Sequence, residues 1–148
     1  MTEVMSGKNI VLYADDDIDD LQLVEEAFSQ YSQNVELITV KDGIEALSYL
    51  VHLLESGVTP CLIILDINMP RMDGKETLIA VRKMKGLEKT PAILFTTSSQ
   101  TIDKEFARKY NAGFLTKPID CTHMEIIAER FINHCSDEIK KNIAKNSL

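Results

Sequence analysis

The segment CLIILD, residues 61–66, decides the fold, because five apolar residues in succession are followed directly by an acidic one. A strand with one solvated face alternates apolar and polar side chains, whereas a strand that is buried on both faces is apolar throughout. Burial on both faces is typical of a parallel sheet covered by helices. The segment therefore predicts a buried parallel strand that stops at Asp66.

Two further segments of strand length precede this one, NIVLYA at 9–14 and VELITV at 35–40. Each is followed by a helical repeat, over about 18–31 and about 42–57. The apolar face of the first helix consists of Leu21, Val24, Phe28 and Tyr31. The apolar stripe expected for the second helix consists of Ile44, Leu47, Val51 and Leu54, with Gly57 at its exit.

The same alternation continues after residue 66. The sequence predicts a helix over about 75–84, with Leu78 and Val81 inward, and then a buried strand in PAILFTTSS at 91–99. A helix closed by Gly113 and a short strand in FLTKP at 114–118 follow. A final helix is expected from about Cys121, with its apolar side formed by Met124, Ile127, Phe131 and Cys135.

Strands and helices that alternate at this length predict an α/β fold, a doubly wound five-stranded parallel sheet with helices on both faces. The 148 residues suit one domain over 1–148, with a core over about 8–135. Residues 136–148 are expected either to extend the last helix or to fray. No internal repeat or low-complexity linker is visible.

The composition excludes several classes of function. A net charge of -7 argues against binding to nucleic acid, which requires clustered Lys and Arg. Three cysteines without C-x-x-C spacing predict neither a disulfide framework nor a zinc site. The longest apolar stretch, CLIIL, is far shorter than the roughly 20 residues of a membrane span. We therefore expect a cytoplasmic protein without nucleic-acid or membrane partners.

Polar side chains are expected to converge where the strands end. Strand one is followed by Asp15 and Asp16 and strand three by Asp66. Strand four presents Thr96 and Thr97, and strand five leads to Lys117. Ligands of such folds bind beyond the carboxyl ends of the strands. Grouped carboxylates are how proteins hold Mg²⁺, and a carboxylate beside it can act as a nucleophile toward phosphorus. The pattern predicts a magnesium site with an aspartate that can be phosphorylated.

The acidic run ADDDIDD, residues 14–20, also permits a different interpretation. With Asp15 at position 1, it nearly matches the calcium-loop template, with Asp17, Asp19 and Glu26 at charged positions. Position 6 of that loop requires glycine, but here it is Asp20. Asp19 and Asp20 are therefore interpreted as exposed residues of the first helical turn, where the helix dipole favours negative charge. Asp17 is expected to cap the helix or to face a partner.

Four segments together resemble the receiver domain of bacterial two-component response regulators: IVLYADDD, LIILDINMPRMDG, AILFTTSS and AGFLTKP. The resemblance covers about residues 8–135. The chain also resembles, more loosely, the stand-alone receivers that carry no DNA-binding effector domain. It implies a flavodoxin-like receiver fold. It also implies that Asp66 is the phosphoacceptor, and that Asp15, Asp16, Asp66 and the main-chain carbonyl of Asn68 bind Mg²⁺, Asp16 more directly than Asp15.

The resemblance further assigns roles to residues after strands three, four and five. Lys117 would pair with the phosphoryl group, and Pro118 would follow a cis peptide bond. Thr96 would be the switch hydroxyl and Phe114 the aromatic ring whose rotamer follows it. Asn68 and Ser98 would tune the lifetime of the phosphoryl group.

The resemblance also implies partners and an output. A sensor histidine kinase or a phosphotransfer protein would donate the phosphoryl group, and the domain would catalyse its own phosphorylation and dephosphorylation rather than act as an enzyme on a separate substrate. The output would be a protein–protein contact through the face of helix four, strand five and helix five, or a phosphorylation-dependent homodimer. Two alternatives remain: a small aspartyl-phosphate hydrolase, disfavoured by Asn68 in place of a second Asp, and a constitutive binding module.

Overall fold

The computed structural model describes residues 8–118 and 124–143. Within them, five parallel strands form one sheet in the order β2-β1-β3-β4-β5. The strands are β1 (Asn9–Ala14), β2 (Val35–Val40), β3 (Leu62–Leu65), β4 (Ala92–Thr96) and β5 (Gly113–Thr116). The order changes direction between β1 and β3, so the predicted doubly wound α/β fold is confirmed.

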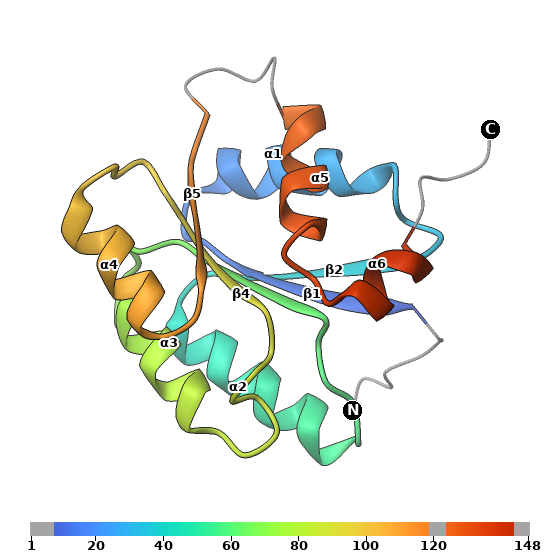
Figure 1. The fold of residues 1–148 in the computed structure, drawn as a ribbon, viewed down its shortest axis with the longest axis horizontal. Coiled ribbons are helices and arrows are strands. Elements are labelled where there is room, and N and C mark those ends of the chain that lie inside the picture. Colours follow the sequence, from blue (N-terminus) through green and yellow to red (C-terminus); the bar gives the residue numbers. More distant parts are fainter. Residues whose placement is uncertain (1–7, 119–123, 144–148) are drawn as a thin grey trace.

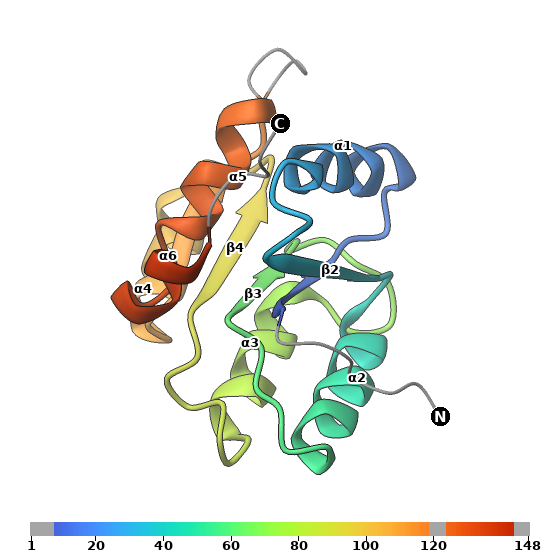
Figure 2. The ribbon, with the colours of Figure 1, turned by 90° about the vertical axis from the view of Figure 1, so that its right-hand side faces the viewer.

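Helices cover both faces of this sheet (Figure 1). They are α1 (Ile18–Ser29), α2 (Gly43–Glu55), α3 (Gly74–Lys83), α4 (Thr101–Lys109), α5 (Met124–Ile132) and α6 (Asp137–Asn142). The helices α1 and α5 lie on one face, and α2, α3 and α4 lie on the other. Figure 2 shows the sheet between these two layers after a quarter turn.

The strand register brings the carboxyl ends of β1 and β3 side by side. Ala14 pairs with Leu65, and the backbone N–H of Asp66 donates to the carbonyl of Ala14 at 3.0 Å. Leu65 pairs in turn with Leu94, two residues before the end of β4. The polar residues that follow these strands therefore share one edge of the sheet.

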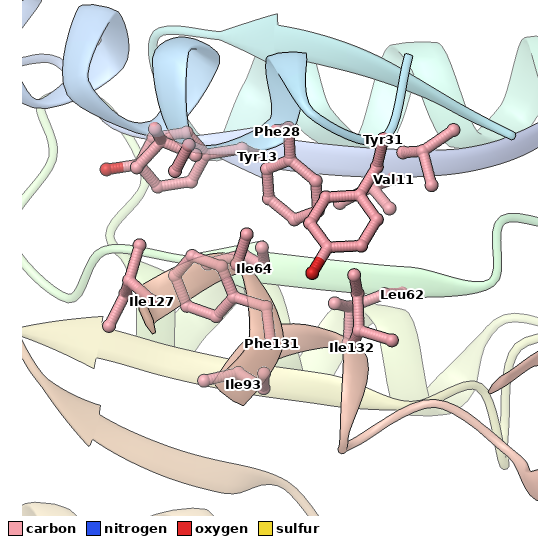
Figure 3. Packing of buried hydrophobic residues seen from close by; sticks show 14 of the residues in the cluster. Val11, Tyr13, Phe28, Tyr31, Leu62, Ile64, Ile93, Ile127, Phe131 and Ile132 are labelled. Carbon is pink, nitrogen blue, oxygen red and sulfur yellow. The ribbon is translucent and has the colours of Figure 1, made fainter. Parts of the chain in front are cut away.

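The layer between the sheet and the helices α1 and α5 is built around stacked rings (Figure 3). Phe28 of α1 and Phe131 of α5 are parallel, with centroids 5.9 Å apart. Phe131 also meets Phe95 of β4 edge to face, at 5.0 Å. The predicted apolar face of α1 is buried as expected, which confirms the helical periodicity of that segment.

The apolar stripe expected for α2 is wrong at two of its four positions, whereas Leu47 and Leu54 are partly buried against the core. Ile44 and Val51 are 44% and 45% exposed, and the buried face of the helix carries Ala46, Leu50 and Leu53 instead. Helix α2 is apolar around most of its circumference, so its sequence fits more than one stripe. In the structure, the small side chain of Ala46 is completely buried in the core layer on this face of the sheet.

The C-terminal segment folds in a way that the sequence does not predict. Helix α5 ends at Ile132, and a separate short helix, α6, begins after Ser136, whose hydroxyl accepts a hydrogen bond from the Ile139 backbone at 3.3 Å. Ile143 after α6 is buried in the core. Of the apolar side expected for the last helix, Ile127, Phe131 and Cys135 are buried, whereas Cys121 and the side chain of Met124 lie outside the described residues.

Two further expectations concern cysteines and membranes. Cys61 and Cys135 are buried free thiols, in keeping with the absence of a predicted disulfide framework. Across the residues that the structure describes, no helix has both the length and the apolar character that crossing a membrane demands.

Candidate functional site

Three carboxylates meet at the carboxyl edge of the sheet. Asp15 and Asp16 follow β1, and Asp66 follows β3. Asp15 is fully buried and Asp66 is 5% exposed, whereas Asp16 is exposed to solvent. One oxygen from each of the three lies within 4.8 Å of the others. The structure thus brings together the acidic residues that the sequence singled out, in a group that fits a divalent cation.

Lys117 reaches this group from the end of β5. Its Nζ lies 2.8 Å from Asp15 Oδ2 and 3.4 Å from Asp66 Oδ2, and its side chain is only 9% exposed. The backbone N–H of Lys117 donates to the carbonyl of Thr96 at 2.7 Å, which fixes the start of this segment against β4. The ammonium of Lys117 therefore faces carboxylates that follow two other strands.

Asp20 belongs to the same group, although the sequence interpretation placed it on the exposed surface of α1. Its Oδ2 accepts a hydrogen bond from Lys117 Nζ at 2.7 Å, and its side chain is 28% exposed. The expectation of a simple surface residue is therefore wrong. A signal was present in the sequence, because Asp20 is one helical turn before the buried Val24 and so lies on the inward side of α1.

The carboxylate of Asp15 is held by three donors from the protein. Its Oδ1 accepts the Asp17 backbone N–H at 2.9 Å, and its Oδ2 accepts Lys117 Nζ and the hydroxyl of Tyr13. Tyr13 is completely buried, and Figure 3 shows its hydroxyl at the edge of the core cluster, away from the other labelled rings. From the sequence, Tyr13 is predicted only as a strand residue. In an extended chain, side chains two residues apart point to the same side, so the position of Tyr13 before Asp15 was a signal for this contact.

The electrostatics of the site leave negative charge unmatched. Burial and the nearby charge of Asp15 raise the pKa of Asp66 from 3.8 to about 7, against the opposing effect of Lys117. Burial acts to lower the pKa of Lys117, but its hydrogen bonds to Asp15 and Asp20 prevail and raise it, so this ammonium stays charged. Burial, followed by the charge of Asp15, raises the pKa of Tyr13, which keeps its hydroxyl as a donor. Among the residues that the structure describes, one cation thus faces several carboxylates, and a second cation would relieve their repulsion.

The remaining members of the acidic run do not form a calcium loop. Asp17 caps α1, accepting the backbone N–H groups of Asp19 and Asp20 at 2.9 and 3.3 Å. Because α1 already begins at Ile18, the residues that a calcium loop would need in loop conformation are helical. The run is therefore divided between the site at the sheet edge and the cap of a helix.

Thr96 and Ser98 lie on the β4 side of the site. Thr96 ends β4 and is fully buried, and its Oγ1 accepts the Ser98 backbone N–H at 3.2 Å. Ser98 Oγ donates to Asp103 Oδ2 at 2.6 Å. Phe114 of β5 is half-buried and packs against the core layer of α2, α3 and α4.

The loop from β3 to α3 is held closely over Asp66. Asn68 is exposed, and its backbone amide acts to lower the pKa of Asp66. A side chain at Gly74 would place its Cβ 2.1 Å from the carbonyl oxygen of Asp66, so only glycine allows α3 to begin here.

The expectation of a cis bond before Pro118 is wrong, since no described peptide bond is cis.

Comparisons with known proteins find related sequences and related folds. The family model described as the response regulator receiver domain matches residues 11–129. A curated relative, the response regulator Rcp1 of a Synechocystis species, is 30% identical over 105 residues, which are 70% of this chain and 71% of that protein. The probable methanogenesis regulatory protein FilR2 of Methanothrix harundinacea is also 30% identical, over 74% of this chain and 72% of its own length.

Solved structures show the same similarity. The phosphorylated cyanobacterial phytochrome response regulator RcpA superimposes with a TM-score of 0.76 at 26% identity, over 87% of this chain and 97% of that one. The chemotaxis response regulator CheY4 of Vibrio cholerae gives a TM-score of 0.67 at 30% identity, over 84% and 98%. A form of Rcp1 described as Mn²⁺-bound gives 0.72 at 27% identity, over 82% and 92%.

Proposed function

The chain belongs to the family of response regulator receiver domains, which act as phosphorylation-dependent signalling switches, and we propose that Asp66 is the residue that accepts its phosphoryl group. The observation that carries the proposal is the placement of Asp66. Its carboxylate lies at the edge of the sheet within 4.8 Å of Asp15 and Asp16 oxygens and 3.4 Å from Lys117 Nζ. A nucleophile, a cation and metal-binding carboxylates are thus within reach of one phosphorus atom.

In the proposed reaction, a carboxylate oxygen of Asp66 attacks the phosphorus of a phosphohistidine on a sensor histidine kinase or a phosphotransfer protein. The new P–O bond forms as the P–N bond breaks, and the donor imidazole takes up a proton from solvent. Lys117 stays paired with the phosphoryl oxygens as their charge develops. The later attack of water on the same phosphorus would regenerate Asp66, so the domain would catalyse both its own phosphorylation and its own dephosphorylation.

We assign the divalent metal to Mg²⁺, held by Asp16, Asp66 and the main-chain carbonyl of Asn68, with Asp15 beside them. When bound, Mg²⁺ supplies charge that neutralises the phosphoryl oxygens. The donor set supports the order of these ligands, because Asp15 already accepts three hydrogen bonds from the protein. Asp16 is exposed and free of that constraint, and is therefore the more direct ligand.

The proposed switch connects Asp66 with a distant face. Thr96 would move its hydroxyl toward the phosphoryl group, and the ring of Phe114 would follow, while Asn68 and Ser98 would set how long the group persists. Moving such an equilibrium from 1:99 to 99:1 takes about 5.5 kcal/mol of differential stabilisation, which a few charge-assisted hydrogen bonds can supply.

The output of the switch would be a contact with another protein through the face of α4, β5 and α5, with a phosphorylation-dependent homodimer as the alternative. The free thiols of Cys61 and Cys135 are in keeping with the cytoplasmic location that such a donor and output require.

The test is to incubate the protein with acetyl phosphate, with and without Mg²⁺, and to measure its intact mass. We expect one added phosphoryl group that depends on Mg²⁺ and is lost in Asp66→Asn. Asp42→Asn is the matched control, because Asp42 is equally buried but lies outside the site, and it should retain the adduct. An adduct that survives in Asp66→Asn would refute the assignment, and rapid turnover of small phosphate esters would favour a hydrolase instead.

A further inference from the structure

A buried carboxylate connects the turn after β4 with helix α3. Asp103, in the first turn of α4, is 7% exposed, and its two oxygens have different partners. Its Oδ2 accepts a hydrogen bond from Ser98 Oγ at 2.6 Å, and its Oδ1 lies 2.5 Å from Lys75 Nζ in α3. The residues Lys75, Asp103 and Ser98 form what we call the α3–α4 latch.

The latch is charged and mostly shielded from water. The hydrogen bonds from Lys75 and from Ser98 lower the pKa of Asp103, so its carboxylate remains ionised. The Lys75 side chain is 28% exposed, and its Nζ also lies 5.3 Å from the centre of the Phe106 ring. Charge-assisted hydrogen bonds in such surroundings are stronger than neutral ones, so the latch resists stretching.

Both ends of the latch lie next to the proposed phosphorylation site. On one side, the Ser98 backbone N–H donates to Thr96 Oγ1 at 3.2 Å. On the other side, Lys75 follows Gly74, whose backbone packs directly against the Asp66 carbonyl and donates to the carbonyl of Ile67 at 2.9 Å. The latch therefore ties the turn that carries the switch hydroxyl to the helix that starts above the phosphoacceptor.

We propose that Asp103 is a positioning residue that holds the β4–α4 turn in its unphosphorylated conformation and so opposes the movement of Thr96 toward a phosphoryl group on Asp66. This inference rests on the proposed function of Asp66 and Thr96. Ser98 is two residues from Thr96, so a shift of Thr96 pulls on the bond between Ser98 and Asp103. Asp103 cannot follow freely, because Lys75 anchors it to α3.

The consequence is measurable as an affinity. If only a fraction of molecules is in the conformation that accepts the phosphoryl group, the apparent dissociation constant of a phosphoryl mimic is raised in inverse proportion to that fraction. Weakening the latch increases the fraction. We expect Asp103→Ala to bind beryllofluoride with Mg²⁺ about threefold to tenfold more tightly than the unmodified protein, since both bonds of the carboxylate are lost.

Graded variants separate the two bonds. Asp103→Asn retains an acceptor for Ser98 but loses the charge that pairs with Lys75, so its effect should be intermediate. Lys75→Met should resemble Asp103→Asn. The double variant Lys75→Met/Asp103→Ala should bind no more tightly than Asp103→Ala alone, because both changes break the same latch. Glu105→Ala is the control, since it removes an exposed carboxylate from the same helix without touching the latch.

Binding is followed by two-dimensional amide NMR during titration with beryllofluoride in the presence of Mg²⁺, and thermal unfolding is measured for each variant. Tighter binding in Asp103→Ala despite equal or lower stability supports the positioning role. A merely structural role predicts lower stability with unchanged or weaker binding, and that result would overturn it. If the unmodified protein neither binds beryllofluoride nor forms an acetyl phosphate adduct, the proposed function itself has failed, which is a different outcome.

Discussion

Two aspartates at the carboxyl edge of the sheet are buried to nearly the same degree, but their pKa values are shifted in opposite directions. Asp42 follows β2 and is 3% exposed, and Asp66 follows β3 and is 5% exposed. The pKa of Asp42 is lowered, whereas that of Asp66 is raised to about 7. Burial alone acts upward on both, so the difference comes from their partners.

Asp42 is matched to its surroundings. Its Oδ1 accepts the Glu45 backbone N–H at 2.9 Å as the cap of α2, and its Oδ2 accepts Arg71 Nε at 2.8 Å. Asp66 instead shares Lys117 with Asp15 and Asp20. A carboxylate with its own counter-charge, such as Asp42, holds two loops together. A carboxylate that shares its counter-charge with others, such as Asp66, keeps a charge imbalance that a metal ion and a phosphoryl group can use.

The largest effect on stability should come from removing the cation beside each aspartate, Lys117 at Asp66 and Arg71 at Asp42. Lys117→Met removes the ammonium that two buried carboxylates share, Asp15 and Asp66, and should lower the free energy of unfolding by about 3–5 kcal/mol at neutral pH without metal. Arg71→Met, the matched change at Asp42, should lower it by less, because the Arg71 side chain is 58% exposed. Urea unfolding measures both, and equal losses would contradict the comparison.

The second prediction concerns pH. Because the pKa of Asp66 is higher in the folded state than its ordinary value, its favourable contribution is complete below about pH 4 and is lost as the pH rises to about 7. Asp66→Asn should therefore increase the stability of the metal-free protein by on the order of 2–4 kcal/mol at pH 8. Stability curves of both proteins from pH 4 to 8 should diverge with rising pH; parallel curves would refute the unmatched charge.

The same substitution at the matched site should have the opposite sign. Asp42→Asn keeps the cap of α2 but loses the charge that pairs with Arg71, so it should lower stability by about 1–2 kcal/mol at pH 7. The folded pKa of Asp42 is lowered, so its contribution is present above the ordinary aspartate value and fades as the pH falls. Chemical unfolding at pH 7 and at about pH 3 checks this, with a difference that should shrink in acid.

The smallest effect is expected at Tyr13. Tyr13→Phe keeps the ring in the core but removes one of three donors to Asp15, which should lower stability by about 1 kcal/mol. It should also change the affinity for Mg²⁺, measured by calorimetry, because the carboxylate next to the metal is less restrained. Tyr31→Phe, two residues after the end of α1, is the control and should leave Mg²⁺ binding unchanged. If Tyr13→Phe leaves both quantities unchanged, the hydroxyl does not position Asp15.

The fold was accessible from the sequence because its signals are local. The continuous apolar run at 62–65 and the periodicity of α1 come from burial patterns that repeat at fixed intervals. The apolar face of α2 was not accessible in the same way. Its buried face carries Ala46, Leu50 and Leu53, and periodicity alone does not distinguish that face from the one carrying Ile44 and Val51.

The residues of the candidate site likewise fall into a group that the sequence predicts and a group that it does not. Asp15, Asp16, Asp66, Thr96 and Lys117 were predicted together because parallel strands end at a common edge. Asp20 and Tyr13 were missed, since their roles depend on side-chain directions. The carboxylate of Asp20 contacts Lys117, which lies 97 positions later in the chain, and the hydroxyl of Tyr13 points toward Asp15.

The sequence by itself determined the order of strands and helices, the parallel sheet and the residues at its carboxyl edge, because residue type and spacing encode burial and chain direction. Only the tertiary structure decided how the charges are shared: that Lys117 serves three carboxylates, that Asp42 is satisfied by Arg71, and that Asp103 links Ser98 to Lys75. Electrostatic pairing depends on distances of a few ångströms between residues far apart in the chain, and those distances exist only after the helices have packed on the sheet.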